Sequence, residues 1–203
     1  KGCEGFDNIA GMVGWENIIM STLNTPANKR FEGMTVRDIA KARGTDPVDC
    51  VCDMLIEENC AITMIDFITC EEDIARILNC GFASVISDSI YPASGRPHPR
   101  LYGTYARIIQ RFVGERRDMT LEAAVKAMTY TPAKALNIAD RGLLREGLCA
   151  DVNVFDPAEV KERGSYADPD KCAAGMDYVF VNGKTAIAAG ELTGGAFGQV
   201  IRR

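Results

Sequence analysis

The sequence predicts an α/β fold followed by a β-rich carboxyl-terminal segment. Apolar runs of strand length alternate with amphipathic helical stretches up to about residue 88, and two longer helical stretches follow. Beyond residue 139 the sequence changes to short β-type runs separated by glycines. Strands that alternate with helices imply right-handed βαβ units and a parallel sheet. We therefore expect one domain over residues 1–139 and a second over residues 140–203.

Length, composition and charge limit the class of protein. The chain has 203 residues, of which 47% are hydrophobic and 25% charged, so it can form a buried core and is too apolar to be wholly disordered. Its net charge is -5, with no long run of one sign, which argues against nucleic-acid binding. No apolar run reaches the ~20 residues of a membrane helix, and no signal peptide is evident at the start. We expect a cytoplasmic protein without a membrane partner.

The cysteine and histidine counts constrain metal chemistry. The eight cysteines are spread along the chain without a CxxC motif, and we interpret them as mostly reduced and buried. There is one histidine, His98. A catalytic zinc site of the histidine-rich type takes several such ligands, so this chain cannot form one by itself. Either the chemistry is not metal-based or part of the site is missing.

The first elements follow from apolar runs and capping residues. Residues 16–23 form a predicted buried strand, followed by a polar loop. Thr35 is suited to cap a helix that Gly44 ends. A second helix begins after Asp46 with Pro47 at its first position, and it runs to about residue 59 with Val48, Val51, Cys52, Leu55 and Ile56 on its apolar face.

Later elements continue the alternation. Residues 61–69 are a predicted strand, 71–79 an amphipathic helix and 81–88 a third strand, followed by the loop of residues 89–99. Helices are expected over 101–115 and 120–138, the second with Thr120 as its cap and a break at Pro132.

The carboxyl-terminal segment contains a strand over 148–157 and a hairpin over 177–192, whose Asn182-Gly183 pair suits a type I′ turn. A sheet of so few strands is only marginally stable by itself. We therefore expect these strands to complete a sheet together with other parts of the protein.

Candidate functional residues lie in three loops that follow the predicted strands, because in parallel α/β folds the carboxyl ends of the strands meet at one face. These loops hold Asn28, Lys29 and Arg30; Thr69 and Glu71; and the segment from Asp88 through Tyr91, Arg96 and His98 to Arg100.

Asp88 is the sharpest candidate, since a carboxylate at the end of an apolar strand is costly to bury without a metal or a cation. The alternative is that Asp88 caps a turn by accepting backbone N–H bonds. Asp66, in the middle of its predicted strand, is better explained as a structural aspartate.

Arg100 begins a helix, where the dipole does not favour a cation, so we expect an acidic partner from the protein or from a substrate. His98 lies between two prolines and could be functional or simply a hydrogen-bonding surface residue. For Lys29 and Arg30 the alternative is ordinary solvation.

Several segments together resemble a known family. They are VISDSIYPASGRPHPRLYGTYARIIQRFV, MTLEAAVKAMTYTPAKALNIADRGLLREGLCADVNVFDP and YVFVNGK, with NKRFEGMTVRDIAKARGTDPVDCVCDMLIEE upstream. They are similar to the carboxyl-terminal part of the N-acyl-D-amino-acid deacylases (D-aminoacylases) of the amidohydrolase superfamily. The resemblance covers nearly the whole chain.

The resemblance implies a zinc-dependent (β/α)8 barrel flanked by a small β-sandwich. Residues 1–139 would form the carboxyl-terminal portion of the barrel, and residues 140–203 part of the sandwich. The family's HxH motif, its metal-binding cysteine and its other ligand histidines lie on earlier strands and have no counterpart here. We therefore expect a carboxyl-terminal fragment, inactive alone, whose missing amino-terminal half carries most zinc ligands.

The resemblance also implies site roles. Asp88 matches the aspartate at the end of the last barrel strand. It would touch the zinc, take a proton from the metal-bound water that attacks the amide carbonyl, and deliver it to the departing amine. For the substrate carboxylate we propose Arg100, Arg30 and Tyr91 from their loop positions.

The expected activity is hydrolysis of N-acyl-D-amino acids to a carboxylate and a D-amino acid. One alternative keeps the superfamily but takes a cyclic amide, as dihydroorotase and hydantoinase relatives do. Another is a non-catalytic module that associates with itself through open sheet edges, giving a homo-oligomer.

Overall fold

The computed structural model describes residues 4–91 and 95–201, which form two compact units. The first contains the described residues of 1–70 and 88–101, together with 165–170. The second contains residues 71–87, 102–164 and the described residues of 171–203. The predicted boundary between residues 139 and 140 falls inside the second unit and stays a prediction.

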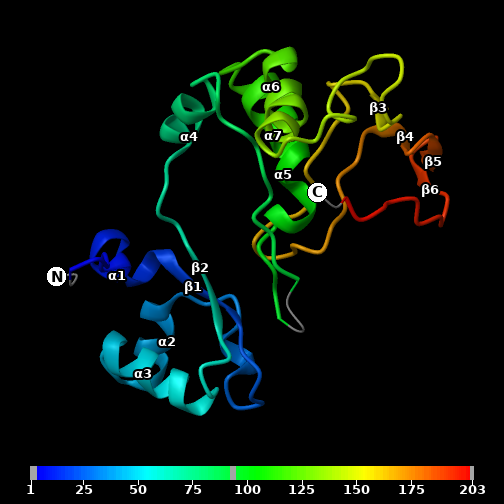
Figure 1. Cartoon of the computed structure of the whole chain (residues 1–203). Helices are drawn as coiled ribbons and strands as arrows, with labels where there is room; N and C mark the ends of the chain where they lie inside the picture. Colours follow the sequence, from blue (N-terminus) through cyan, green and yellow to red (C-terminus); the bar gives the residue numbers. More distant parts are fainter. Residues whose placement is uncertain (1–3, 92–94, 202–203) are drawn as a thin grey trace. The chain divides into compact units, whose positions relative to one another are not determined.

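The first unit joins a two-stranded sheet to a pair of helices (Figure 1). Its elements in chain order are α1 (Ile9–Val13), η1 (Trp15–Asn17), β1 (Ile18–Thr22), η2 (Lys29–Phe31), α2 (Val36–Arg43), α3 (Pro47–Glu57) and β2 (Thr63–Asp66).

The strands β1 and β2 are antiparallel, with Ile18 opposite Asp66 and Met20 opposite Met64. The predicted parallel pairing is therefore wrong for these strands. A single helix between two strands returns the chain to the sheet end where the first strand began. Here two consecutive helices, α2 and α3, lie between the strands. The second helix brings the chain back to the sheet end at which β1 finished, so β2 runs in the opposite direction to β1.

The predicted helix boundaries in this unit are confirmed. The Thr35 hydroxyl accepts the backbone N–H of Asp38 at the start of α2, and Gly44 ends that helix with a φ of 71°. The Asp46 carboxylate accepts the N–H of Val48 at the start of α3. These caps leave a short turn between the helices.

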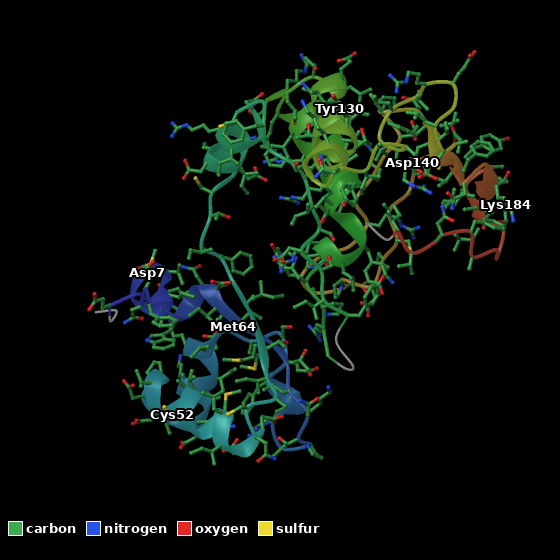
Figure 2. The ribbon with its side chains drawn as sticks, viewed as in Figure 1. Asp7, Cys52, Met64, Tyr130, Asp140 and Lys184 are labelled. Atoms are coloured by element: carbon green, nitrogen blue, oxygen red, sulfur yellow. The ribbon has the colours of Figure 1, made fainter. Side chains whose placement is uncertain are left out.

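The core of the first unit lies between the sheet and the helices. Its buried members are Ile18, Met20, Leu23, Phe31, Val36, Ile39, Ala40, Cys50 and Met54. The predicted apolar face of α3 is partly wrong, because Val48 and Ile56 are exposed and Cys50 and Met54 pack inward. The cysteines are also less buried than predicted: of those described, Cys50 is buried, whereas Cys52, which Figure 2 labels on α3, is exposed.

The second unit combines helices with an antiparallel sheet. Its elements are α4 (Glu71–Leu78), η3 (Ile108–Glu115), α6 (Leu121–Met128), α7 (Tyr130–Ala135), β3 (Val152–Phe155), β4 (Met176–Val181), β5 (Lys184–Ala188) and β6 (Glu191–Leu192). Helix α5 (Arg100–Arg107) begins in the first unit, continues into the second and leads into η3, which is a π-helix. Two buried clusters stabilise this unit, one around Phe112 and Ala124 and one around Ile109 and Val160.

The third predicted strand, residues 81–88, has no regular structure. Val85 is buried and donates its N–H to the carbonyl of Ala127 rather than to a neighbouring strand. A strand needs a paired neighbour to satisfy its backbone. The described part of the chain offers this segment no such neighbour, which explains the wrong prediction.

The later elements agree better with the sequence. Thr120 caps α6 through the N–H of Ala123, and the helical run breaks at Thr129, three residues before Pro132.

The sheet of the second unit has the order β3-β4-β5-β6, and all its neighbouring strands are antiparallel. Between β4 and β5, Asn182 has a φ of 51° and Gly183 a φ of 75°, as a type I′ turn requires. None of the helices formed by the described residues is long and apolar enough to cross a membrane.

Candidate functional site

Asp88 and Arg100 form an ion pair in the first unit. The Arg100 Nη2 lies 2.9 Å from the Asp88 Oδ2. The Asp88 side chain is 74% exposed and that of Arg100 is 42% exposed. The acidic partner predicted for Arg100 is thus present, and the protein itself provides it.

The setting of Asp88 differs from the prediction. It follows an irregular segment rather than a strand, and it is exposed rather than buried. Its φ of 46° lies in the left-handed region, which aspartate and asparagine adopt more readily than most residues. The ion pair with Arg100 therefore balances the charge of Asp88 at the protein surface.

His98 holds the backbone at the start of α5. Its Nδ1 accepts the N–H of Arg100 at 3.0 Å, so the imidazole takes the place of a capping side chain. Pro97 and Pro99 on either side are buried. The His98 ring meets the ring of Tyr166 edge to face at 5.2 Å. This histidine fixes the chain next to the candidate arginine.

The loop before Arg100 is attached to the end of β1. The Arg96 N–H donates to the Ser21 carbonyl at 3.0 Å, and the Ser21 hydroxyl donates to the Arg96 carbonyl at 2.8 Å. A Cβ added to Gly33 would lie 2.7 Å from Arg96 Nη1. The third candidate loop therefore contacts β1 at Ser21 and passes close to Gly33, although it does not follow a strand as predicted. Residues 92–94 lie outside the described residues.

The other two proposed substrate residues, Arg30 and Tyr91, have contacts or exposure of their own. Arg30 places its guanidinium 4.6 Å from the ring centroid of Phe31. Tyr91 is 76% exposed. Within the described residues, neither side chain hydrogen-bonds or ion-pairs with Asp88 or Arg100. Their proposed role stays a prediction.

A buried carboxylate that the sequence analysis did not select organises the first candidate loop. Glu58 is 3% exposed and accepts hydrogen bonds from Asn24, Thr25 and Asn28. Burial alone would raise the pKa of Glu58, but these hydrogen bonds lower it to about 2. The sequence offered one signal for this role, which is that Glu58 is an acidic residue at the predicted end of a helix.

Glu71, a candidate of the second loop, has a structural setting in the second unit. Its carboxylate pairs with three arginines, Arg107, Arg111 and Arg116. The hydrogen bond from Arg111 lowers the pKa of Glu71, and the nearby arginine charges act in the same direction. With its oxygens engaged in this way, Glu71 links α4 to α5, η3 and the residue that follows η3.

The described residues do not make up a zinc site. Within residues 4–91 and 95–201, no three or more histidine, cysteine, aspartate or glutamate side chains gather closely enough to hold a metal ion. Asp88 contributes one carboxylate, and its nearest charged partner is a cation. The set of donors thus falls short of the three protein ligands that a catalytic zinc takes.

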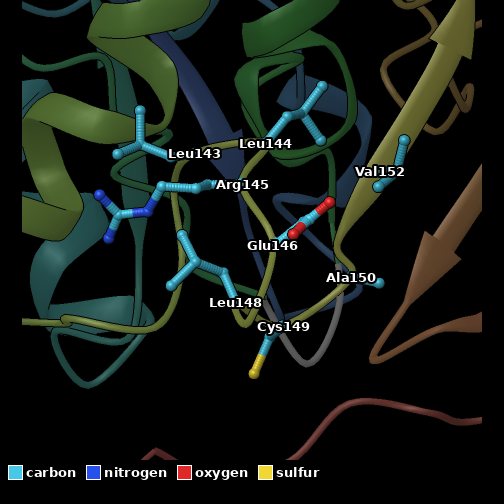
Figure 3. A pocket seen from close by; sticks show the side chains of 8 residues that line it. All are labelled: Leu143, Leu144, Arg145, Glu146, Leu148, Cys149, Ala150 and Val152. Carbon is cyan, nitrogen blue, oxygen red and sulfur yellow. The ribbon is translucent and has the colours of Figure 1, made fainter.

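A shallow hollow of about 280 Å³ lies in the second unit, lined by residues between Leu143 and Val152 (Figure 3). The thiol of Cys149 donates to the Asp140 Oδ2 at 3.1 Å. That hydrogen bond and burial raise the pKa of Cys149, which keeps the thiol protonated and weakly nucleophilic. None of the predicted site residues lines this hollow.

Known proteins resemble the chain over most of its length. The model of the amidohydrolase family matches residues 24–187. An N-acyl-D-glutamate deacylase of Alcaligenes xylosoxydans xylosoxydans is 37% identical over 165 residues, which is 81% of this chain and 32% of that protein. A D-aminoacylase of the same organism is 34% identical over 173 residues, which is 85% of this chain and 34% of that protein.

Solved structures agree with these matches. A D-aminoacylase crystal structure superposes with a TM-score of 0.81 at 32% identity, covering 92% of this chain and 38% of that one. An N-acyl-D-glutamate deacylase from Bordetella bronchiseptica, solved with zinc and a phosphonate mimic of the tetrahedral intermediate, gives 0.82 at 33% identity, covering 96% of this chain and 39% of that one. The chain spans about a third of the length of the curated relatives. Because the family model covers most of its residues, the chain belongs to the amidohydrolase family.

Proposed function

We propose that this chain serves the hydrolysis of N-acyl-D-amino acids to a carboxylate and a D-amino acid. The observation that carries the proposal is the pairing of Asp88 with Arg100 in a chain whose relatives are deacylases of D-amino acids. The pair brings together a carboxylate that can carry a proton and a guanidinium that can bind a substrate carboxylate.

Each residue then has a defined task. The guanidinium of Arg100 binds the carboxylate of the N-acyl-D-amino acid, with Arg30 and Tyr91 as further candidates for the same group. A water molecule attacks the amide carbonyl and loses a proton to Asp88. When the C–N bond breaks, Asp88 gives this proton to the departing nitrogen, so the products are a carboxylate and an amine.

The proposal includes a metal-dependent (β/α)8 barrel with a small β-sandwich, supported by the superposition on D-aminoacylase. Zinc is its cofactor, with Asp88 as the ligand from this chain. The remaining ligands are not among the described residues, so we expect the 203-residue chain with added zinc to show no turnover. Measurable hydrolysis by the purified chain would contradict this expectation.

Substrate binding tests the proposal directly. The purified chain is titrated with N-acetyl-D-glutamate, N-acetyl-L-glutamate and hydantoin while the amide and arginine side-chain NMR signals are followed. We expect the D-enantiomer to shift the signals of Arg100 and to bind more tightly than the L-enantiomer, and we expect Arg100→Gln to weaken this binding. A preference for hydantoin would favour a cyclic-amide hydrolase instead.

A further inference from the structure

We propose that Tyr166 is a positioning residue for the carboxylate-binding arginine: its ring holds the imidazole of His98, which in turn holds the backbone of Arg100. The inference rests on the proposed function for the role of Arg100 in substrate binding. It adds a residue from a distant part of the sequence to those that determine the affinity for the substrate carboxylate.

The contacts form a continuous series within the first unit. The Tyr166 ring meets the His98 ring edge to face, with centroids 5.2 Å apart and planes at 79°. The Nδ1 of His98 accepts the backbone N–H of Arg100 at 3.0 Å. Tyr166 also meets the ring of Phe67, with centroids 4.9 Å apart and planes at 67°. Both ring pairs have the separation and the edge-to-face arrangement that aromatic groups favour.

Phe67 connects these contacts to regular structure. It follows the last residue of β2, and its backbone N–H donates to the carbonyl of Asn17 at 3.0 Å. Asn17 directly precedes β1. The ring of Tyr166 therefore packs on a residue whose backbone is bound at the edge of the two-stranded sheet.

The segment that carries Tyr166 is closed by its own hydrogen bonds. The N–H of Ser165 donates to the carbonyl of Asp168, and the N–H of Asp168 donates to the hydroxyl of Ser165, both at 3.0 Å. Residues 165–170 belong to the first unit, although the residues on either side of them in the sequence belong to the second. This turn brings Tyr166 to the unit that contains Arg100.

His98 needs a neighbour of this kind because its backbone does not fix its ring. Pro97 and Pro99 are buried and restrict the backbone on either side of His98. Neither proline limits the rotation of the two side-chain bonds of the histidine, on which the direction of Nδ1 depends. A ring packed edge to face limits that rotation. Tyr166 thus helps to keep Nδ1 directed at the N–H of Arg100.

This constraint acts where it can affect binding. Arg100 is the first residue of α5, and the N–H groups of a first helical turn have no partner within the helix. Without the acceptor on His98, the helix start would fray. An arginine on mobile backbone loses more conformational freedom when it binds a carboxylate, so it binds that carboxylate less tightly.

Tyr166→Ala and Tyr166→Phe are the central comparison. Alanine removes both ring contacts, whereas phenylalanine keeps the ring and removes only the hydroxyl. From the strength of aromatic pairs, we expect hydrogen exchange at the Arg100 amide to become about two- to tenfold faster in Tyr166→Ala and to stay near the wild-type rate in Tyr166→Phe. Exchange at the amides of α2 and α3 should stay unchanged, which excludes a general loss of stability.

Substrate binding is measured on the same proteins. The dissociation constant for N-acetyl-D-glutamate, from the shift of the Arg100 Nε–Hε NMR signal, should rise about two- to fivefold in Tyr166→Ala and stay unchanged in Tyr166→Phe. Tyr178→Ala is the matched control. Tyr178 is 42% exposed against 43% for Tyr166 and also packs on a ring, that of Phe180, but it belongs to the second unit. It should have no effect at Arg100.

A double-mutant cycle tests whether Tyr166 acts through His98. A His98→Asn background lacks the imidazole but keeps a side-chain acceptor for the Arg100 N–H. In that background, Tyr166→Ala should not change the exchange of the Arg100 amide. The inference is overturned by an equal acceleration in this background, by equal effects of Tyr166→Ala and Tyr166→Phe, or by a uniform acceleration throughout the first unit.

Acetate and N-acetyl-L-glutamate distinguish this inference from the proposed function. If Tyr166→Ala weakens the binding of all carboxylates at Arg100 alike and the D-enantiomer has no advantage, the positioning role stands and the proposed substrate class fails. If the wild type prefers N-acetyl-D-glutamate through Arg100 but Tyr166→Ala changes neither affinity nor exchange, the proposed function stands and the positioning role fails. If no carboxylate shifts the Arg100 signal in the wild type, both fail.

Discussion

The hydroxyl of Thr25 donates to the Glu58 carboxylate at 2.5 Å, and the backbone N–H of Thr25 donates to it at 3.1 Å. The N–H of Asn24 and the amide of Asn28 complete the set. Glu58 follows the last residue of α3, whereas its donors lie in the loop after β1. One buried carboxylate thus fastens the first candidate loop to the end of a helix.

The pKa of Glu58 predicts acid sensitivity of the first unit. Hydrogen bonding lowers it to about 2 in the folded protein, from an ordinary value of 4.5. The stabilisation is therefore present above pH 4.5 and is lost as the pH falls towards 2. We expect the free energy of unfolding to fall by about 1 to 3 kcal/mol over this range. Urea unfolding followed by the fluorescence of Trp15, the single tryptophan of the sequence, measures it, because Trp15 packs on the core of this unit.

Glu58→Gln should destabilise the first unit at pH 7 by about 2 kcal/mol, because it leaves buried donors facing an amide that accepts fewer hydrogen bonds. Trp15 fluorescence in urea is again the measurement. Glu57→Gln is the matched control: its side chain is 44% exposed, and we expect a smaller loss of about 0 to 1 kcal/mol. Equal losses for the two variants, or an unchanged acid sensitivity in Glu58→Gln, would show that the Glu58 hydrogen bonds are not the cause.

Glu71→Gln should loosen α4 from its neighbours in the second unit. The change removes the charge that Arg107, Arg111 and Arg116 share. Hydrogen exchange at the amides of α4 should become faster than in wild type. Asp73→Asn is the control, since Asp73 is also an acidic residue of the first turn of α4 but pairs only with Arg76, at 3.5 Å, among the ion pairs of the described residues. If both variants accelerate exchange alike, the arginine cluster has no special role.

His98→Ala should free the start of α5. The Nδ1 of His98 accepts the N–H of Arg100, and loss of such a capping acceptor costs about 1 kcal/mol. The expected result is faster hydrogen exchange of the Arg100 amide. His98→Asn carries a side-chain oxygen near the position of Nδ1 and should restore much of the protection. Equal exchange in the two variants would mean that the imidazole packs against Tyr166 but does not hold the backbone.

The sequence predicted local features well and long-range pairing poorly. Thr35, Gly44, Asp46, Thr120 and the Asn182-Gly183 turn act within a few residues of themselves, so their identities suffice. The direction of β2 depends on the number of helices before it, and residues 81–88 lack a strand partner among the described residues. Arg100 was expected to have an acidic partner, but that Asp88 would be this partner depends on tertiary contacts. Glu58 was missed because its position at the end of a helix is a weak signal in the sequence, and its burial depends on tertiary contacts.

Gly175→Ala should destabilise the second unit far more than Gly190→Ala. Both glycines have positive φ, 88° and 83°, so an alanine is strained at either position by about 1 kcal/mol. At Gly175 an added Cβ would also lie 2.3 Å from the backbone oxygen of Glu159 and 2.6 Å from the Cα of Val160, whereas at Gly190 it meets nothing within 4 Å.

This contact involves backbone that cannot move without disturbing Val160, which is fully buried in the cluster around Ile109. We therefore expect a loss of about 3 kcal/mol or more for Gly175→Ala, measured by hydrogen exchange at the amides of β3 and β4. Similar losses for the two variants would mean that conformational strain alone explains the requirement for glycine. A larger loss at Gly175 means that the close approach of two backbone segments makes glycine necessary there.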